Sequence, residues 1–166
     1  MSTFEKMCET LIYRNFPHVV TVKNTKGDTE ELIENDSVGG DGDVICGMRE
    51  LHSAGITVCD IRVGRGPEGQ VKITDIKCFG YQDEPPLNTR YNLPESSYVK
   101  FKSDIWCLGC FLIGKNIPKR FTKSQELLDG FLKDAPDYIK VMLKIDPSQR
   151  ELPFKKSDDG QGCVIC

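Results

Sequence analysis

The sequence predicts a single, mainly helical α+β domain, and three observations support this fold class. The chain has 166 residues, a length that suits one domain. Apolar side chains recur at helical spacing in several segments, and short apolar runs bounded by glycine turns predict strands between them. The composition, with 39% hydrophobic and 28% charged residues, is that of a globular protein.

The first elements follow from local signals. Ser2 and Glu5 form a capping box, and the apolar residues behind it predict a helix over about 3–14. After this helix we expect two strands at 19–23 and 30–34, then a flexible, glycine-rich linker over 36–43.

The remaining elements are mostly helical. One helical face over 44–52 precedes two short strands, 55–58 and 70–74, with a glycine turn between them. Residues 76–101 contain three prolines and predict an extended loop. Further helices are expected from Ser103 to about 113, over 124–132 and over 134–145, followed by a mobile tail at 155–166.

Charge and hydropathy exclude several classes of protein. With a net charge of −3, the chain has no basic field to attract nucleic acid. The longest apolar run, 105–114, is about half of what a membrane helix needs. The first residues are not a secretory signal, so we expect a cytoplasmic protein whose eight cysteines are reduced.

Five sequence blocks stand in a characteristic order. They are 51–62 (LHSAGITVCDIR), 71–75 (VKITD), 91–95 (YNLPE), 102–110 (KSDIWCLGC) and 142–150 (MLKIDPSQR). Together they resemble the C-lobe of a eukaryotic protein kinase over about 44–150. The resemblance implies an N-lobe remnant and hinge-like linker at 1–43, a kinase-like C-lobe at 44–154 and a flexible tail at 155–166.

The resemblance implies roles for individual residues. Asp60 matches the carboxylate that orients the substrate hydroxyl, and Arg62 the position of a phosphate-contacting lysine. Asp75 matches the ligand of magnesium on ATP, so Mg-ATP is the implied cofactor if the nucleotide site survives. Glu95 and Arg150 match a buried ion pair that supports the fold. Asp104 matches an anchor of the catalytic loop, and Trp106, in the same block, matches a residue that supports the fold.

Other positions depart from the kinase pattern. Val58 and Cys59 replace a His-Arg pair, Arg65 stands where a magnesium-binding asparagine is expected, and Lys77 replaces a glycine after Asp75. A cation at Arg65 would repel a second metal ion. Residues 1–15 contain neither a glycine-rich phosphate loop nor the V-A-I-K strand that carries the lysine of the kinase pattern. The G-x-G-x-x-G-x-V spacing at 64–71 is interpreted as a turn, because it follows Asp60 and no helix comes after it.

The sequence therefore leads to one principal hypothesis and two alternatives. The principal hypothesis is a catalytically impaired, pseudokinase-like domain in signalling, which binds a kinase, a kinase substrate or a regulator through the surface around 76–101. The first alternative is a weak or conditional serine/threonine kinase that uses Asp60, Arg62 and Asp75. The second is a thiol oxidoreductase based on the W-C-x-x-C sequence at 106–110, which requires an exposed Cys107 at a helix N-terminus.

The last cysteines allow two further interpretations. Cys163 begins a C-a-a-X sequence at 163–166 and is a candidate for prenylation, which would add weak, peripheral membrane association. Cys163 and Cys166 also have metal-ligand spacing, and with Cys107 and Cys110 they would make a four-thiolate zinc site. The prediction that 107–110 lies in a buried helix argues against zinc.

Overall fold

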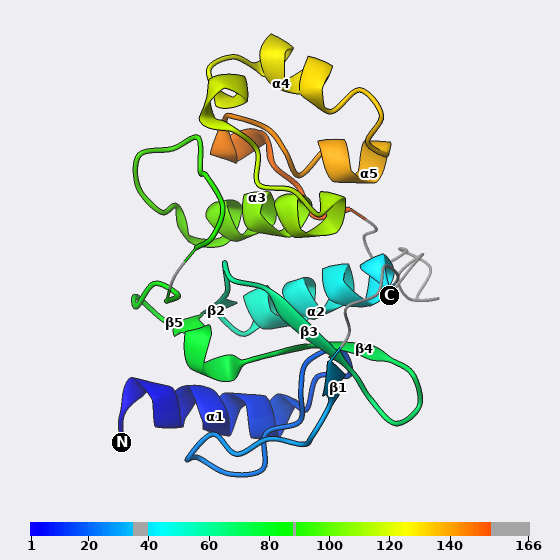
Figure 1. Ribbon diagram of the computed structural model, residues 1–166. Helices are drawn as coiled ribbons and strands as arrows, with labels where there is room; N and C mark the ends of the chain where they lie inside the picture. The colour runs from blue at the N-terminus through cyan, green and yellow to red at the C-terminus, as the bar shows by residue number, and fades with distance from the viewer. Residues whose placement is uncertain (35–39, 88, 154–166) are drawn as a thin grey trace, which may run out of the picture.

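The helices and strands of this computed structural model, described over residues 1–34, 40–87 and 89–153, are stacked in layers (Figure 1). Helix α1 (Thr3–Arg14) forms one end of the stack. A small sheet and the helices α2 (Asp41–Ser53) and α3 (Lys100–Ile113) follow in turn. The short helices α4 (Gln125–Phe131) and α5 (Asp137–Lys140) lie at the other end.

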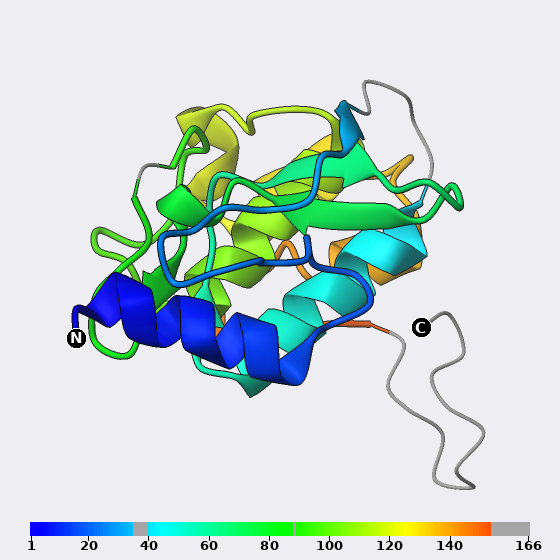
Figure 2. The same ribbon diagram turned by 90° about the horizontal axis from the view of Figure 1, so that it is seen from below.

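Helix α1 has the predicted bounds and the predicted cap. Ser2 Oγ accepts a hydrogen bond from the backbone of Glu5 at 3.1 Å, and Glu5 Oε1 accepts one from the backbone of Ser2 at 3.4 Å. Asn15 ends the helix in a left-handed conformation with φ of 47°. The inward face of α1 carries Met7, Cys8 and Leu11, which are buried. Figure 2, which views the molecule from below, shows α1 at the front and to the side of the longer strands of the sheet.

The three-stranded sheet has the order β1 (Ile33–Glu34), β3 (Arg62–Arg65), β4 (Val71–Thr74). Strands β3 and β4 form an antiparallel hairpin closed by the glycine turn, where Gly66 N donates to Gln70 O at 2.8 Å. Gly69 has φ of 85°, which a residue with a side chain rarely adopts. The predicted strand 19–23 is reduced to isolated bridges at Val19 and Val22.

Two strand predictions need correction. The predicted strand 55–58 exists only as β2 (Ile56–Thr57), and it pairs with β5 (Gly80–Tyr81) rather than with the strand at 70–74. Strand β3 was not predicted, because its sequence RVGR carries two arginines and a glycine and shows no apolar run. The region 76–101, predicted as a loop, contains β5 and the 3-10 helix η1 (Ile76–Cys78).

Helix boundaries also differ from the prediction. Helix α2 begins at Asp41, within the predicted linker 36–43, of which 36–39 lie outside the described residues. Helix α3 begins at Lys100, so Ser103 lies in its first turn. Ser103 Oγ accepts a hydrogen bond from the backbone of Val99, the residue before the helix, at 2.7 Å. The predicted helix 134–145 shrinks to α5. After α5 the backbone bonds are i→i−3 turns, from Met142 N to Ile139 O and from Leu143 N to Lys140 O, and Ile145 N donates to Gln125 Oε1 at 2.9 Å instead of to a helical carbonyl.

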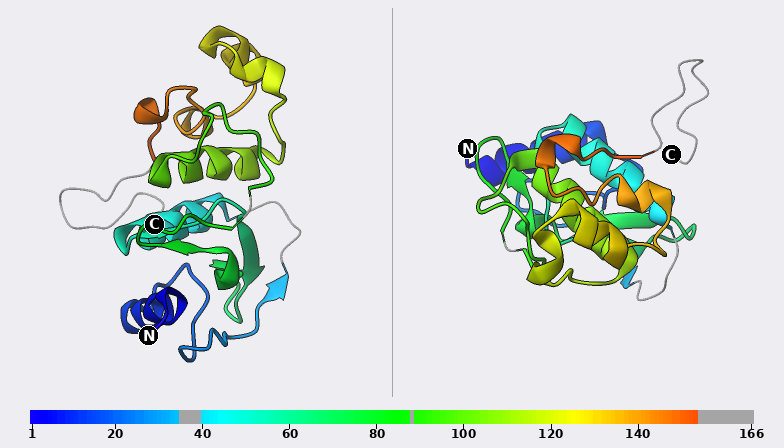
Figure 3. Two further views of the ribbon diagram at one scale, coloured as in Figure 1. Left: turned by 90° about the vertical axis from the view of Figure 1, so that its left-hand side faces the viewer. Right: turned by 90° about the horizontal axis from the view of Figure 1, so that it is seen from above.

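One hydrophobic core joins the two predicted segments 1–43 and 44–154. It contains Met7 and Val19 from the first segment together with Leu51, Trp106 and Met142 from the second. Figure 3 shows the sheet held between α1 on one side and α2 and α3 on the other. Within the described ranges, none of the helices has the length and apolar character needed to cross a membrane.

Candidate functional site

Asp60 and Asp75 are brought together by the β3–β4 hairpin. Asp60 lies in the bend just before β3, and Asp75 follows β4 directly. In the ladder between these strands, Arg62 lies opposite Thr74, the residue that precedes Asp75. The register therefore places both predicted carboxylates at one end of the hairpin, with Arg62 between them.

Arginine side chains neutralise these two carboxylates. Arg62 lies between them, with Nη2 3.4 Å from Asp60 Oδ2 and Nε 3.5 Å from Asp75 Oδ2. Arg90, from the loop after β5, places both Nε and Nη2 2.7 Å from Asp60 Oδ1. Each carboxylate oxygen of Asp60 thus faces a guanidinium group, and the contacts to Arg90 are the shorter ones.

The carboxylates and their arginines differ in exposure. The side chain of Asp60 is 10% exposed and that of Asp75 is 38% exposed, whereas Arg62 and Arg90 are 54% and 48% exposed. Asp75 has a left-handed backbone with φ of 67°, which turns the chain from β4 into η1. Burial and a hydrogen bond to Asp75 raise the pKa of the Cys78 thiol above its ordinary value.

A cavity of about 730 Å³ lies beside Arg62 and Asp75. Its volume is within the range of about 300–1,000 Å³ that is usual for small-molecule sites. The charged side chains around it are mixed in sign: Asp28 and Asp75 face Arg62, Lys77 and Arg90. The cavity is thus large enough for a nucleotide, but its two arginines, Arg62 and Arg90, already contact carboxylates.

Asp75 is the described carboxylate best placed to hold a metal ion in this cavity. It is partly exposed, yet its Oδ2 already contacts Arg62 and receives a hydrogen bond from Cys78 at 3.4 Å. No group of three or more His, Cys, Asp or Glu side chains suited to a metal occurs in the described part of the chain. A magnesium ion at Asp75 would therefore lie close to the Arg62 cation, which would repel it.

The prediction for Arg65 needs correction. Arg65 pairs with Val71 at the far end of the β3–β4 ladder from Arg62 and Asp75. Its guanidinium donates to Gly69 O at 2.9 Å across the hairpin turn. The cause is the direct passage of the chain from Asp60 into β3, which carries residue 65 away from the carboxylates. Arg62 and Arg90, rather than Arg65, supply the positive charge at this site.

Asp104 anchors the segment that carries Asp60. Its carboxylate is fully buried and accepts hydrogen bonds from Val58 N at 2.9 Å and from Cys59 Sγ at 3.3 Å. The Tyr98 hydroxyl donates to it at 2.7 Å, and His52 Nε2 lies 2.8 Å away. Burial and the charge of Asp104 raise the pKa of Tyr98 well above its ordinary value. Through Asp104, helix α3 thus holds Val58 and Cys59, the two residues before Asp60.

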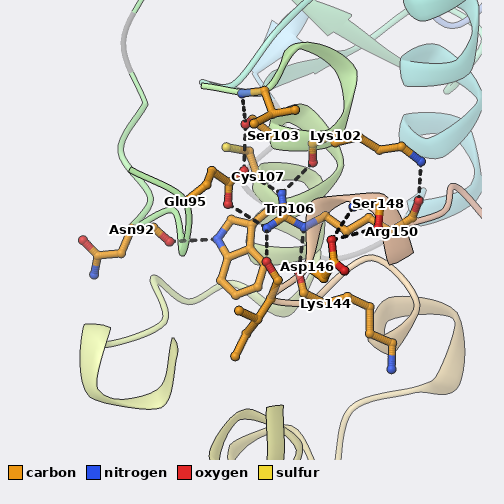
Figure 4. Close-up of polar contacts among 12 residues, drawn as sticks. Asn92, Glu95, Lys102, Ser103, Trp106, Cys107, Lys144, Asp146, Ser148 and Arg150 are labelled. Carbon is orange, nitrogen blue, oxygen red and sulfur yellow. Dashed lines mark hydrogen bonds and ion pairs between the residues drawn. The ribbon is translucent and has the colours of Figure 1, made fainter. Parts of the chain in front are cut away.

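Glu95 and Arg150 form the expected buried ion pair (Figure 4). The two Arg150 Nη atoms each lie 2.7 Å from a different oxygen of Glu95. Arg150 is fully buried and also donates to the carbonyls of Lys102 and Lys144 at 2.9 and 2.7 Å. Burial raises the pKa of Glu95, but the hydrogen bonds from Arg150 and Ser103 outweigh it and hold this pKa below its ordinary value.

Trp106 completes this buried cluster. Its indole Nε1 donates to Asn92 O at 2.8 Å, and the Arg150 guanidinium lies 5.1 Å from its ring centroid. Figure 4 shows the indole and Glu95 on the same side of α3, facing Arg150. The loop before α3 is therefore fixed to α3 and to the segment that follows α5.

Sequence reasoning did not single out Arg90, Tyr98 or His18 as polar partners. Arg90 and Tyr98 lie in a segment without periodic pattern, so no local signal predicts their contacts with Asp60 and Asp104. His18 Nδ1 lies 2.6 Å from Glu50 Oε2, and its Nε2 lies 3.6 Å from Asp43 Oδ1. The hydrogen bond with Glu50 raises the pKa of His18 above its ordinary value.

The cysteines of the W-C-x-x-C sequence do not have the geometry that thiol redox chemistry requires. Cys107 and Cys110 are fully buried within α3, and Cys107 is in the middle of the helix rather than exposed at its N-terminus. Burial raises the pKa of Cys110 above its ordinary value. The candidate lipidation site Cys163 and the second C-x-x-C pair lie outside the described residues.

Comparison with protein-family models found no match to this chain, and comparison with curated proteins found none either. The kinase resemblance therefore rests on the five sequence blocks alone and stays a prediction.

Proposed function

We propose that this protein is a kinase-like interaction domain that does not transfer phosphate. The observation that carries the proposal is the 2.7 Å contact between Arg90 and Asp60. By resemblance Asp60 would accept the substrate hydroxyl, and a general base needs an oxygen within about 2.6–3.2 Å of the group it serves. Arg90 takes up that oxygen, and Arg62 lies against the other one.

Electrostatics at Asp75 support the same proposal. Phosphoryl transfer depends on positioning and on cations held at the phosphates, with magnesium supplying much of that charge when ATP is bound. The Arg62 cation, 3.5 Å from Asp75 Oδ2, would repel a metal ion bound to that carboxylate. The interaction role is supported by the Glu95–Arg150 pair and by the hydrogen bond from Tyr98 to Asp104, because these contacts fix two positions of the segment before α3 to which a partner could bind.

One observation favours a second candidate, the conditional serine/threonine kinase. Arg62 and Arg90 are about half exposed, and Arg62 would remain beside the buried Asp60 carboxylate if Arg90 moved away. A partner that drew Arg90 away would leave Asp60 open to a substrate at little energetic cost.

A phosphotransfer assay separates the interaction domain from the conditional kinase. The full chain, Asp60→Ala, Arg90→Ala and Arg90→Ala/Asp60→Ala would be incubated with radiolabelled ATP, magnesium and casein, and Asp83→Ala would control for loss of an exposed carboxylate. The proposal expects no incorporation that depends on Asp60 in any of them. Incorporation by the wild-type chain that Asp60→Ala abolishes would refute it, and incorporation by Arg90→Ala alone would establish the conditional kinase.

A further inference from the structure

A basic stretch of chain lies at the end of the molecule opposite α1, around η2 (Lys119–Thr122) and α4 (Figure 1). The sequence has no Asp or Glu between Asp104 and Glu126, although the net charge of the whole chain is −3. Four cations fall in this interval: Lys115, Lys119, Arg120 and Lys123. All four are exposed, and none forms an ion pair within the described ranges of the chain.

Aromatic rings connect these cations into one surface, which we call the basic strip (Lys115, Lys119–Phe121, Lys123 and Phe131). Lys115 Nζ lies 5.8 Å from the centroid of Phe131, and that ring is 4.6 Å from the ring of Phe121. Arg120 lies over Phe121 at 4.8 Å. Cations over ring faces are attracted by the ring quadrupole, so Lys115 and Arg120 are held in place while their charges stay unpaired.

A second cavity, of about 340 Å³, opens at the Lys115 end of the basic strip. Its apolar lining comes from the end of α3 and from the α4–α5 connection, and includes Ile113, Phe131 and Ala135. The volume is at the lower end of the usual range for binding pockets, enough for one large apolar side chain. The carboxylates of Asp41 and Asp134 also line this cavity, together with the Lys115 end of the basic strip.

We infer that the basic strip and this cavity bind an acidic peptide segment of a partner protein, with one apolar side chain seated in the cavity. This inference rests on the proposed interaction function and names the chemistry of its partner. Unpaired cations attract the carboxylates of the peptide, and the cavity removes its apolar side chain from water. Asp41 and Asp134 repel further acids, so the acidic residues must lie on one side of the apolar residue, over Lys119–Lys123.

Neighbouring charges favour a peptide over an anionic membrane or a nucleic acid. Glu126 and Asp129 are exposed on α4, next to the basic strip. A flat anionic membrane or nucleic acid would bring its negative charges against Glu126 and Asp129. A narrow peptide can lie along the cations of the basic strip and avoid these two carboxylates.

The test is selection of a random peptide library, displayed on phage, on the immobilised full chain. Enriched peptides would be synthesised, and their binding measured by fluorescence anisotropy to the wild type and to Lys119→Glu/Arg120→Glu/Lys123→Glu. The matched control, Lys6→Glu/Lys23→Glu/Lys26→Glu, makes the same change of net charge at exposed sites in the N-terminal segment. Ala135→Trp would fill the cavity, and urea unfolding would verify that each variant folds.

The inference predicts enriched peptides with Asp or Glu beside Leu, Ile or Phe. Charge reversal on the strip should weaken their binding by more than about tenfold, with little change in the control, and added salt should weaken it too. Ala135→Trp should abolish the preference for the apolar residue. Absence of enriched acidic peptides, equal binding by the reversed variant, or binding only to phosphatidylserine vesicles or single-stranded DNA would overturn it. The phosphotransfer assay probes Asp60, which lies outside the basic strip and its cavity. Failure of the proposed function is therefore distinguishable from failure of the peptide-binding inference.

Discussion

Two arginine–carboxylate pairs in this protein have the same 2.7 Å contacts but different surroundings. Arg90 reaches Asp60 from a loop and its side chain is 48% exposed, whereas Arg150 is fully buried against Glu95. The two carboxylates are equally buried, with 10% of each side chain exposed, but Asp60 also has Arg62 beside it. Removing one partner of a buried pair costs about 3–5 kcal/mol, and the second cation should keep the cost at Asp60 well below that. The distance alone therefore does not show what a pair does: Glu95–Arg150 holds the fold, and Asp60–Arg90 is a contact that can open.

The largest effect should come from Arg150→Ala. The substitution leaves Glu95 buried without its cation and removes the donors to three backbone carbonyls. We expect a loss of about 3–5 kcal/mol in the free energy of unfolding, measured by urea denaturation. A loss below about 1 kcal/mol would show that this pair is no more important than an exposed one.

Asp104→Asn should have the next largest effect. The buried carboxylate accepts from Val58 N, Cys59 Sγ and the Tyr98 hydroxyl, and an amide would turn a donor toward one of these donors. We expect a loss of about 2–3 kcal/mol, because hydrogen bonds to buried charged groups are the stronger ones. Urea denaturation measures it, with the exposed Asp83→Asn as control. Equal stability of the two variants would contradict the anchoring role of Asp104.

His18 should make stability depend on pH. Its pKa is raised from about 6.5 by the hydrogen bond with Glu50 and by the charges of Glu50 and Asp43, against burial and Lys72, which lower it. A raised folded-state pKa gives stability that is complete below the unfolded-state pKa and is lost as the pH rises through the folded-state pKa.

We therefore expect the free energy of unfolding to fall, by about 1 kcal/mol or less, as the pH rises above about 6.5. His18→Gln should remove most of this slope, and urea denaturation at a series of pH values measures it. A variant with the same slope as the wild type would assign the pH dependence to another group.

The smallest effect on stability should come from Arg90→Ala. Its guanidinium is about half exposed, and Arg62 stays beside the buried Asp60 carboxylate when Arg90 is removed, so we expect a change below about 1 kcal/mol. The same urea experiment serves here, with Arg150→Ala as the reference. A loss as large as that of Arg150→Ala would remove the distinction between the two regions.

The α+β class and the helices with strong local signals could be predicted from the sequence. The capping box at Ser2 has the expected contacts, because these interactions join neighbours in the chain. The Glu95–Arg150 pair and the contact of Asp104 with the loop were predicted from the family resemblance. The length of α5 and the pairing of β2 were not, since both depend on contacts with distant residues.

The candidate site was predicted only in part. Asp60, Arg62 and Asp75 come together as expected, because the β3–β4 hairpin needs only local pairing. Arg90 was missed, since a loop residue thirty positions from Asp60 gives no periodic signal. Arg65 was misplaced because the position was counted along the sequence without knowledge of β3.

The most direct test of the central claim is a thermal-shift titration with ATP, with and without magnesium, on the wild type and on Asp75→Ala. A ligand present at 100 times its Kd stabilises a protein by about 2.7 kcal/mol, so even modest binding would be visible. Because Arg62 and Arg90 take up the carboxylates, the account predicts no shift at millimolar ATP in either chain. A magnesium-dependent shift that Asp75→Ala abolishes would contradict it and show that the nucleotide site works.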